Sequence, residues 1–145
     1  MDDKEQKEAL HALHRYYIWA NTMRTHFYEL VPKVVADTTK DRFSPQAIEA
    51  DLYMSFWYGE LYVVIEGYHE LKLSDPAIDA LLTSPNVALL KRYRNGVFHF
   101  QKEYFDDRFL DFMLHGKDAA AWVSELNRAF GAFFLRLPAA AVAAP

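Results

Sequence analysis

The chain has 145 residues, of which 52% are hydrophobic and 16% aromatic, so it can bury the core of one domain and is not an intrinsically disordered protein. It has no cysteine, which excludes disulfides, thiolate metal sites and cysteine nucleophiles. The formal net charge of −4 excludes a general basic field, so contact with nucleic acid would depend on a local cluster of basic residues.

The N-terminus and the apolar runs carry no membrane signal. Residues 1–5 are mostly charged, whereas a signal peptide would be apolar soon after its start. The longest apolar runs, such as residues 61–65, are far too short to cross a bilayer. We therefore expect a cytoplasmic protein with no membrane contact.

Apolar residues recur at helical spacing along nearly the whole chain, and almost no stretch alternates as a strand would. Polar capping residues and prolines mark the helix starts; Ser44 followed by Pro45, for example, is typical of an N-cap with a proline in the first turn. The first three expected helices cover residues 3–35, 45–71 and 76–82. A fourth follows Ser84 and Pro85 and carries the apolar residues of 87–98, a fifth follows Asp106 and Asp107 and runs to Leu114, and a last one starts at Asp118 and ends before Pro138.

These helices predict an all-α fold, a bundle of four long helices with one or two short helices, in a single domain over residues 3–137. The helix over residues 45–71 is apolar nearly all round, so we expect it at the centre of the bundle. Residues 138–145 are rich in alanine and proline, and we expect this tail to be disordered.

Residues 94–99, Arg-Asn-Gly-Val-Phe-His, place a permanent cation and a titratable imidazole near each other in an apolar helical segment. Arginine suits phosphate oxygens, and histidine, with a reference pKa of ~6.5, can exchange a proton near neutrality. In a straight helix Arg94 and His99 would lie ~140° apart around the axis and ~7.5 Å apart along it. Asn95 and His99, four residues apart, would share a face. Joint action of Arg94 and His99 therefore requires a long reach by the arginine, a departure from the helix at Gly96, or a second copy of the chain.

The segment Arg94–His99 resembles the motif of the HEPN superfamily, in which an arginine and a histidine are separated by four to six residues and an asparagine commonly follows the arginine. The segment also lies late in a predicted all-α bundle, as that motif does. The resemblance extends to helical order and length over residues 3–137. It implies a HEPN-like bundle that dimerises, with the two motifs forming a shared cleft that in many members cuts RNA without a metal. Such members occur in toxin, defence and mobile-element settings, where a neutralising or partner protein can accompany them.

The resemblance implies that the chain is a metal-independent endoribonuclease acting as a homodimer without a cofactor. An RNA 2′-hydroxyl would attack the adjacent phosphodiester, with His99 as general acid or base. Arg94 would stabilise charge on the phosphoryl oxygens, and Asn95 would orient the phosphate or the imidazole. The candidate substrate-binding residues, which could contact the RNA backbone, are Lys91, Arg92 and Lys102.

A structural role competes for each of these residues. Arg94 could pair with a carboxylate of the second long helix, Glu60 or Glu66, and His99 could be a satisfied core histidine. The chain would then be a noncatalytic helical module that binds a partner protein or a nucleotide. In this interpretation the basic residues Lys91, Arg92 and Lys102 form a solvated face, and the aromatic residues Tyr93, Phe98 and Phe100 belong to the core, although Tyr93 and Phe100 could stack RNA bases if exposed.

Two Glu-x-x-His pairs, Glu8 with His11 and Glu66 with His69, have the spacing by which helical bundles hold two iron or manganese ions. Such sites also need a glutamate from each of two other helices. Glu49 and Glu60 lie on the same helix as Glu66, and Glu103 and Glu125 do not lie on obviously apolar faces. We therefore expect no metal site, and we assign these pairs to surface and tertiary salt bridges.

Overall fold

The computed structural model describes residues 1–137, and within this range the chain is helical and has no strand. The all-α prediction is confirmed, with four long helices and two short ones. The tail over 138–145, expected to be disordered, lies outside the described residues. Among residues 1–137 no helix combines the length and the hydropathy that crossing a bilayer requires. In chain order the helices are α1 (Asp3–Ala36), α2 (Pro45–Glu70), α3 (Pro76–Leu81), α4 (Asn86–Phe98), α5 (Asp107–His115) and α6 (Ala119–Arg136).

The helices begin where the sequence provides capping groups. Asp2 and Glu5 form a capping box at the start of α1, in which the Asp2 carboxylate accepts from the backbone N–H of Glu5 at 2.8 Å. The Ser44 hydroxyl accepts from the N–H of Ala47 at 3.2 Å, and a proline occupies the first turn of α2. The expected helix ends lie close to the observed ones, although Asp118, before α6, has a left-handed backbone and makes no capping bond.

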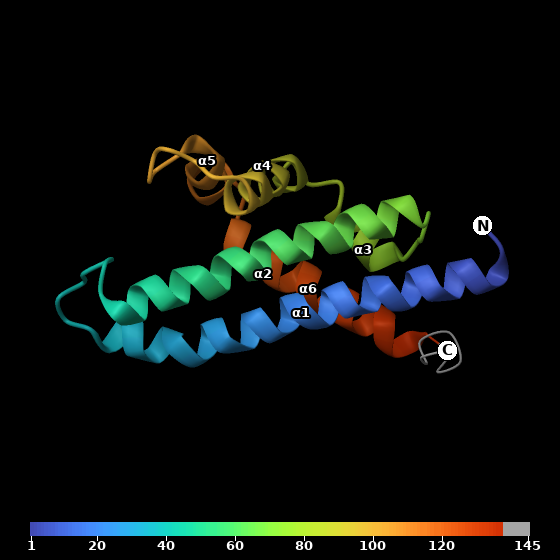
Figure 1. Ribbon diagram of the computed structural model, residues 1–145, viewed down its shortest axis with the longest axis horizontal. Helices are drawn as coiled ribbons and strands as arrows, with labels where there is room; N and C mark the ends of the chain where they lie inside the picture. Colours follow the sequence, from blue (N-terminus) through green and yellow to red (C-terminus); the bar gives the residue numbers. More distant parts are fainter. Residues whose placement is uncertain (138–145) are drawn as a thin grey trace.

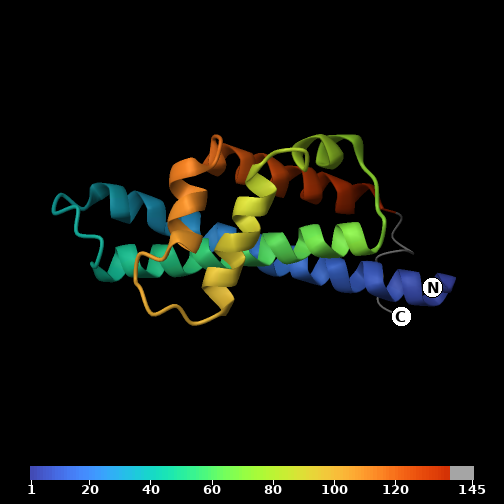
Figure 2. The ribbon, with the colours of Figure 1, turned by 90° about the horizontal axis from the view of Figure 1, so that it is seen from above.

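The two longest helices form the frame of the molecule. α1 and α2 lie side by side in opposite directions along the long axis, and α6 runs obliquely behind them in the view of Figure 1. α4 packs across α2 at a steep angle, and α5 packs against α4 (Figure 2). The short α3 contacts α6. The segment that carries the motif therefore lies across the middle of α2.

α2 is central, as its continuous apolar sequence predicted. Its residues Trp57, Leu61 and Ile65 are almost completely buried. Nε1 of Trp57 donates to Oδ1 of Asn127 on α6 at 3.0 Å, and Nδ2 of Asn127 donates to Oδ1 of Asn21 on α1 at 3.1 Å. These hydrogen bonds satisfy polar atoms that burial would otherwise leave unpaired, and they link three helices through one asparagine.

Candidate functional site

The motif occupies the last turn of α4 and the residue that follows it, and both ends of this helix are held in place. At the start, Oγ of Ser84 accepts from the N–H of Asn86 at 3.1 Å. The buried Asn86 amide exchanges two hydrogen bonds of 2.7 Å with the backbone of Lys117. At the other end, the Phe98 ring lies against Gly59 of α2, where any side chain would collide with it. The motif is therefore presented on a fixed support.

α4 ends at Phe98, so His99 is not part of the helix. Its backbone is extended, with φ −124° and ψ 128°, and its N–H donates to the carbonyl of Asn95 at 3.1 Å. The expectation that Asn95 and His99 share a helical face is wrong, because the four-residue spacing places side chains on one face only while the helix continues. The departure from the helix follows Phe98; Gly96 is buried within α4.

Arg94 is held by α2. Its Nη2 donates to Oε1 of Glu66 at 2.7 Å, and its guanidinium carbon lies 5.0 Å from the centre of the Tyr62 ring. Its Nε is buried without a hydrogen-bond partner among the described residues. Of the two carboxylates considered as partners, Glu66 is the one used. Glu60 instead has a buried, unpartnered Oε2 within residues 1–137, and burial raises the pKa of its carboxyl.

His99 is exposed and lines a groove near the turn that joins α1 to α2. The interpretation of His99 as a buried core histidine is therefore wrong. Arg94 and Asn95 do not line this groove. Within one copy of the chain, Arg94 and His99 therefore do not line this groove together.

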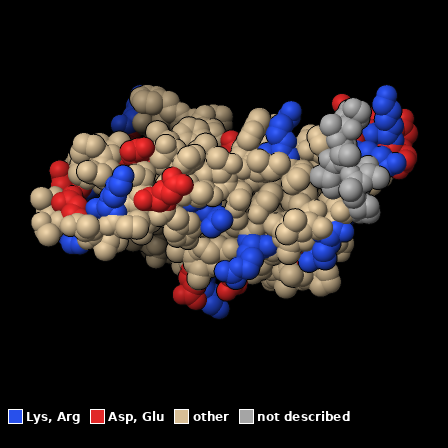
Figure 3. Space-filling view, turned by 90° about the horizontal axis from the view of Figure 1, so that it is seen from below, with Lys and Arg blue, Asp and Glu red and all other residues tan. Residues whose placement is uncertain are grey.

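The three candidate RNA-binding cations are exposed, and none of them lines the groove. Lys91 and Arg92 lie on α4, whereas Lys102 lies in the loop that follows it. Nη2 of Arg92 donates to Oδ2 of Asp111 on α5 at 3.1 Å. On the face shown in Figure 3, basic and acidic side chains are scattered among uncharged ones. Exposure is what the solvated-face interpretation requires of these cations, and it also leaves them accessible to RNA.

The aromatic residues around the motif differ in burial. Tyr93 lies in the core, as predicted, and Phe98 is only partly covered. Phe100 is 92% exposed, so its assignment to the core is wrong. The reason is the end of α4 at Phe98: beyond it, helical spacing no longer directs a side chain inward.

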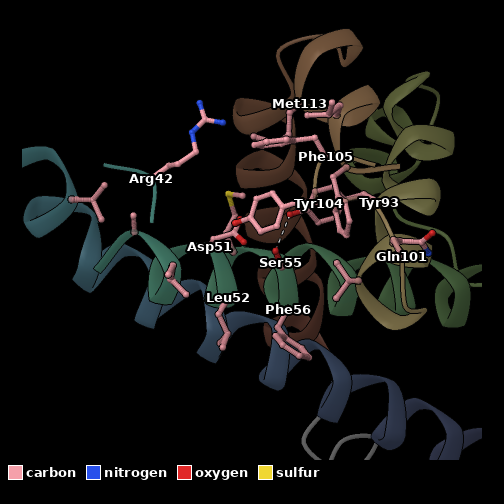
Figure 4. Close-up of a pocket in the computed structure, with 18 of the residues that line it drawn as sticks. Arg42, Asp51, Leu52, Ser55, Phe56, Tyr93, Gln101, Tyr104, Phe105 and Met113 are labelled. Carbon is pink, nitrogen blue, oxygen red and sulfur yellow. Dashed lines mark hydrogen bonds between the residues drawn. The ribbon is translucent and has the colours of Figure 1, made fainter. Parts of the chain in front are cut away.

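The groove is mostly apolar and has a volume of ≈ 980 Å³. Its walls come from the turn after α1, one side of α2, the end of α4, the loop after α4, and α5 (Figure 4). Its apolar and aromatic lining includes Ile48, Leu52, Phe56, Tyr104, Phe105 and Met113. Several of these side chains are substantially exposed, so the groove opens to solvent.

The groove lining also includes a few polar groups from α2 and α4. The hydroxyls of Tyr93 and Ser55 lie 3.0 Å apart and are hydrogen-bonded. Asp51 lies one turn before Ser55 on α2, and Figure 4 shows both below Tyr104. The Asp51 residue is exposed as a whole, but the groove partly removes its carboxyl from water, and this desolvation raises the pKa of the carboxyl. Burial likewise raises the pKa of the Tyr93 hydroxyl.

Sequence reasoning did not identify this groove. The available signal was a pair of polar residues, Asp51 and Ser55, spaced by one turn on an otherwise apolar helix. No pattern marked Tyr104 and Phe105 in advance. Their place in the lining depends on the path of the loop after α4, which periodicity does not specify.

The two Glu-x-x-His pairs stand apart from any third potential metal ligand in the described part of the chain. Glu66 is bound to Arg94, and no group of three His, Cys, Asp or Glu residues within the described range lies close enough to hold a metal ion. The salt-bridge role expected for Glu66 is thus confirmed.

No protein-family model matches the chain, and neither a comparison with curated proteins nor one with solved structures found a match. Membership of the HEPN superfamily therefore stays a prediction that depends on the motif at residues 94–99 and on the order of the helices.

Proposed function

We propose that the chain is a cytoplasmic, metal-independent endoribonuclease with a HEPN-like fold, and that it acts as a homodimer. The observation that supports this proposal is the position of His99, exposed on a groove wall just past the helical turn that carries Arg94. A general acid or base must be accessible to its substrate, and His99 meets that requirement.

The guanidinium of Arg94 retains capacity to bind a phosphate. A guanidinium has five N–H donors, and the hydrogen bond to Glu66 uses one of them. The Arg94 side chain is 21% exposed, so part of it is accessible at the surface. Glu66 and the Tyr62 ring orient the guanidinium, which makes them positioning residues for Arg94 in this proposal.

A second copy of the chain would supply what one copy lacks. Arg94 and His99 do not line the groove together in a single chain, and a two-fold axis near the motif would bring a second set of both residues to the same place. Apolar side chains around the motif are also left uncovered: Phe56 and Phe98, which contact each other, and Phe100. Covering them would contribute favourable burial to dimerisation.

In the proposed reaction, the 2′-hydroxyl oxygen of RNA attacks the adjacent phosphorus. One copy of His99 takes the hydroxyl proton, and the copy in the second subunit gives a proton to the departing 5′ oxygen. Arg94 stabilises the negative charge on the phosphoryl oxygens, while the partly buried Asn95 orients the phosphate. The products are a 2′,3′-cyclic phosphate and a 5′-hydroxyl. Lys91, Arg92 and Lys102 contact the RNA backbone outside the reacting centre.

The test is cleavage of a single-stranded RNA oligonucleotide by the whole chain in EDTA. We expect products that end in a 2′,3′-cyclic phosphate, and a rate reduced ~10²–10⁴-fold in His99→Ala. His115→Ala is the matched control, because His115 is also an exposed histidine at a helix end but lies outside the groove. Cleavage that persists in His99→Ala, or that stops equally in His115→Ala, would refute the proposed role.

One observation favours a second candidate function, a noncatalytic module that binds a partner protein or a nucleotide. The ion pair with Glu66 and the ring of Tyr62 already explain the presence of an arginine at position 94. This candidate predicts no RNA cleavage in any condition, together with retained self-association or partner binding.

A further inference from the structure

The groove beside His99 has the size and the chemistry of a small-molecule site. Pockets for small ligands enclose about 300–1,000 Å³ and combine an apolar lining with a few polar groups that fix orientation. The volume of ≈ 980 Å³ lies within that range. Asp51 and the hydrogen-bonded pair of Ser55 and Tyr93 are polar groups of this kind.

The charge of the lining is negative. Four carboxylates line the groove, those of Asp37, Asp41, Asp51 and Glu103, against the two permanent cations Lys40 and Arg42 and the imidazole of His99. Asp37 and Asp41 accept hydrogen bonds within the turn after α1, from the backbone N–H groups of Thr39 and Phe43. Asp51 differs from them, because it makes no hydrogen bond or ion pair within residues 1–137. A cationic group bound in the groove would give the Asp51 carboxylate the ion pair that no residue of 1–137 supplies.

Two aromatic rings of the groove lining, those of Tyr104 and Phe105, pack against each other with centroids 4.9 Å apart, and one of them already contacts a cation. The Tyr104 ring also packs against that of Phe43, outside the groove, at 5.5 Å. The guanidinium carbon of Arg42 lies 5.3 Å from the centre of the Phe105 ring. Ring faces attract cations electrostatically, and aromatic sites are a recurrent means of recognising substituted ammonium groups. Tyr104 and Phe105 are substantially exposed, so their rings are available to a ligand in the groove.

We propose that this groove binds a small organic cation, an amine or ammonium group attached to an apolar body. The cationic group pairs with Asp51 beneath Tyr104, and the apolar body lies toward Phe105 and Met113, on the side of α2 from which Asp51 and Ser55 project (Figure 4). His99 also lines the groove, whereas the cation is placed at Asp51. Binding of the cation does not depend on ribonuclease activity.

A charge series with a constant apolar body tests this proposal: 4-phenylbutylamine, 4-phenylbutanol and 4-phenylbutyrate, titrated separately into the whole chain and followed by calorimetry. We expect the amine to bind at least about tenfold more tightly than the alcohol, and the carboxylate to bind most weakly. Asp51→Asn should lower affinity for the amine about tenfold and leave affinity for the alcohol within about twofold. Glu49→Gln is the matched control, because Glu49 is an exposed carboxylate of the same helix outside the groove.

A second variant separates the rings from the carboxylate. Tyr104→Leu keeps an apolar side chain but removes the ring, so it should weaken binding of the amine more than binding of the alcohol. Equal affinities for the three compounds, or an amine affinity that Asp51→Asn leaves unchanged, would overturn the proposal. Equal losses in Asp51→Asn and Glu49→Gln would overturn it too, since they would indicate general attraction to an acidic protein. All titrations are made without RNA, so this outcome and that of the cleavage assay are independent.

Discussion

Nη2 of Arg94 and Oε1 of Glu66 lie 2.7 Å apart, and this hydrogen-bonded ion pair joins the last turn of α4 to α2. The same guanidinium lies over the ring of Tyr62. The arginine that resembles a catalytic residue is thus also part of the helix packing. Any experiment on Arg94 has to separate the two roles, and stability measurements can do so without an activity assay.

A double-mutant cycle on this pair measures its structural contribution. We expect Arg94→Met and Glu66→Gln each to lower the free energy of unfolding by about 1 kcal/mol, with a coupling energy of about 0.5–1 kcal/mol. The expected coupling energy is small because the side chains of Arg94 and Glu66 are 21% and 41% exposed, so solvent screens the ion pair. Urea denaturation of the four proteins gives the cycle. A coupling energy of zero would mean that Arg94 is free to act elsewhere.

Removing the charge of Glu60 should stabilise the fold at neutral pH. Oε2 of Glu60 is buried without a hydrogen-bond partner among the described residues, and Glu60 lines a small apolar pocket together with Trp19, Met23 and Phe56. Glu60→Met, which keeps the length of the side chain, should raise the free energy of unfolding by about 1 kcal/mol at pH 7. Urea denaturation measures the change, and Glu49→Gln, an exposed carboxylate on the same helix, should stay within about 0.5 kcal/mol of the wild type.

The stability gained by Glu60→Met over the wild type should increase as pH rises. Burial raises the pKa of Glu60 in the folded chain above its ordinary value of 4.5, so the folded state binds the proton more tightly than the unfolded state. The wild type therefore loses stability as pH rises from about 4.5 through the raised pKa. Glu60→Met lacks this loss, so its advantage should be smallest below pH 4.5 and grow above it. An advantage that grows toward acid pH would contradict the assignment.

Asn127 should be a sensitive core position although it is polar. Its side chain accepts from Trp57 and donates to Asn21, and it is almost fully buried. Asn127→Ala would leave the Trp57 N–H without its partner, and we expect a loss of about 2 kcal/mol or more. Thermal or urea unfolding measures the loss. Thr22→Ala, an exposed change on α1, should alter stability by less than about 0.5 kcal/mol. A loss in Asn127→Ala no larger than this control would show that the network contributes little.

His99→Ala should separate function from folding. His99 is exposed and outside any helix, so its removal should change the free energy of unfolding by less than about 0.5 kcal/mol. If the ribonuclease proposal is correct, the same variant loses its activity while its urea unfolding curve overlays that of the wild type. A large loss of stability would instead assign His99 a structural role.

Phe100 should contribute to self-association and not to the stability of one chain. It is 92% exposed and follows His99 directly, so Phe100→Asp should leave the monomer intact while placing a charge in the proposed interface. We expect light scattering to show a dimer for the wild type and a dissociation constant raised about tenfold or more in the variant. Leu135→Asp, at an 87% exposed residue of α6, is the matched control. Equal effects of the two substitutions would place the interface elsewhere.

Periodicity and capping residues predicted the helices well because both act within a few residues of the chain. Ser44 caps α2 where the sequence indicated. Because α2 is apolar nearly all round, the sequence also predicted correctly that this helix lies at the centre of the bundle. The same reasoning gave a wrong prediction for Phe100, because helical spacing assigned this residue to the core and it is exposed. Spacing predicts burial only inside a helix, and α4 ends two residues earlier.

The sequence by itself determined the all-helical class, the helix ends and a short set of residues able to do chemistry, since these follow from local propensity and residue type. Only the tertiary structure decided which of these residues meet. It selected Glu66 over Glu60 as the partner of Arg94, left His99 exposed apart from Arg94, and gathered Asp51 and Tyr104 into one groove. Those outcomes depend on how α2, α4 and the loop after α4 cross in space, and contacts between residues distant in sequence are set by packing of the whole chain, not by any local pattern.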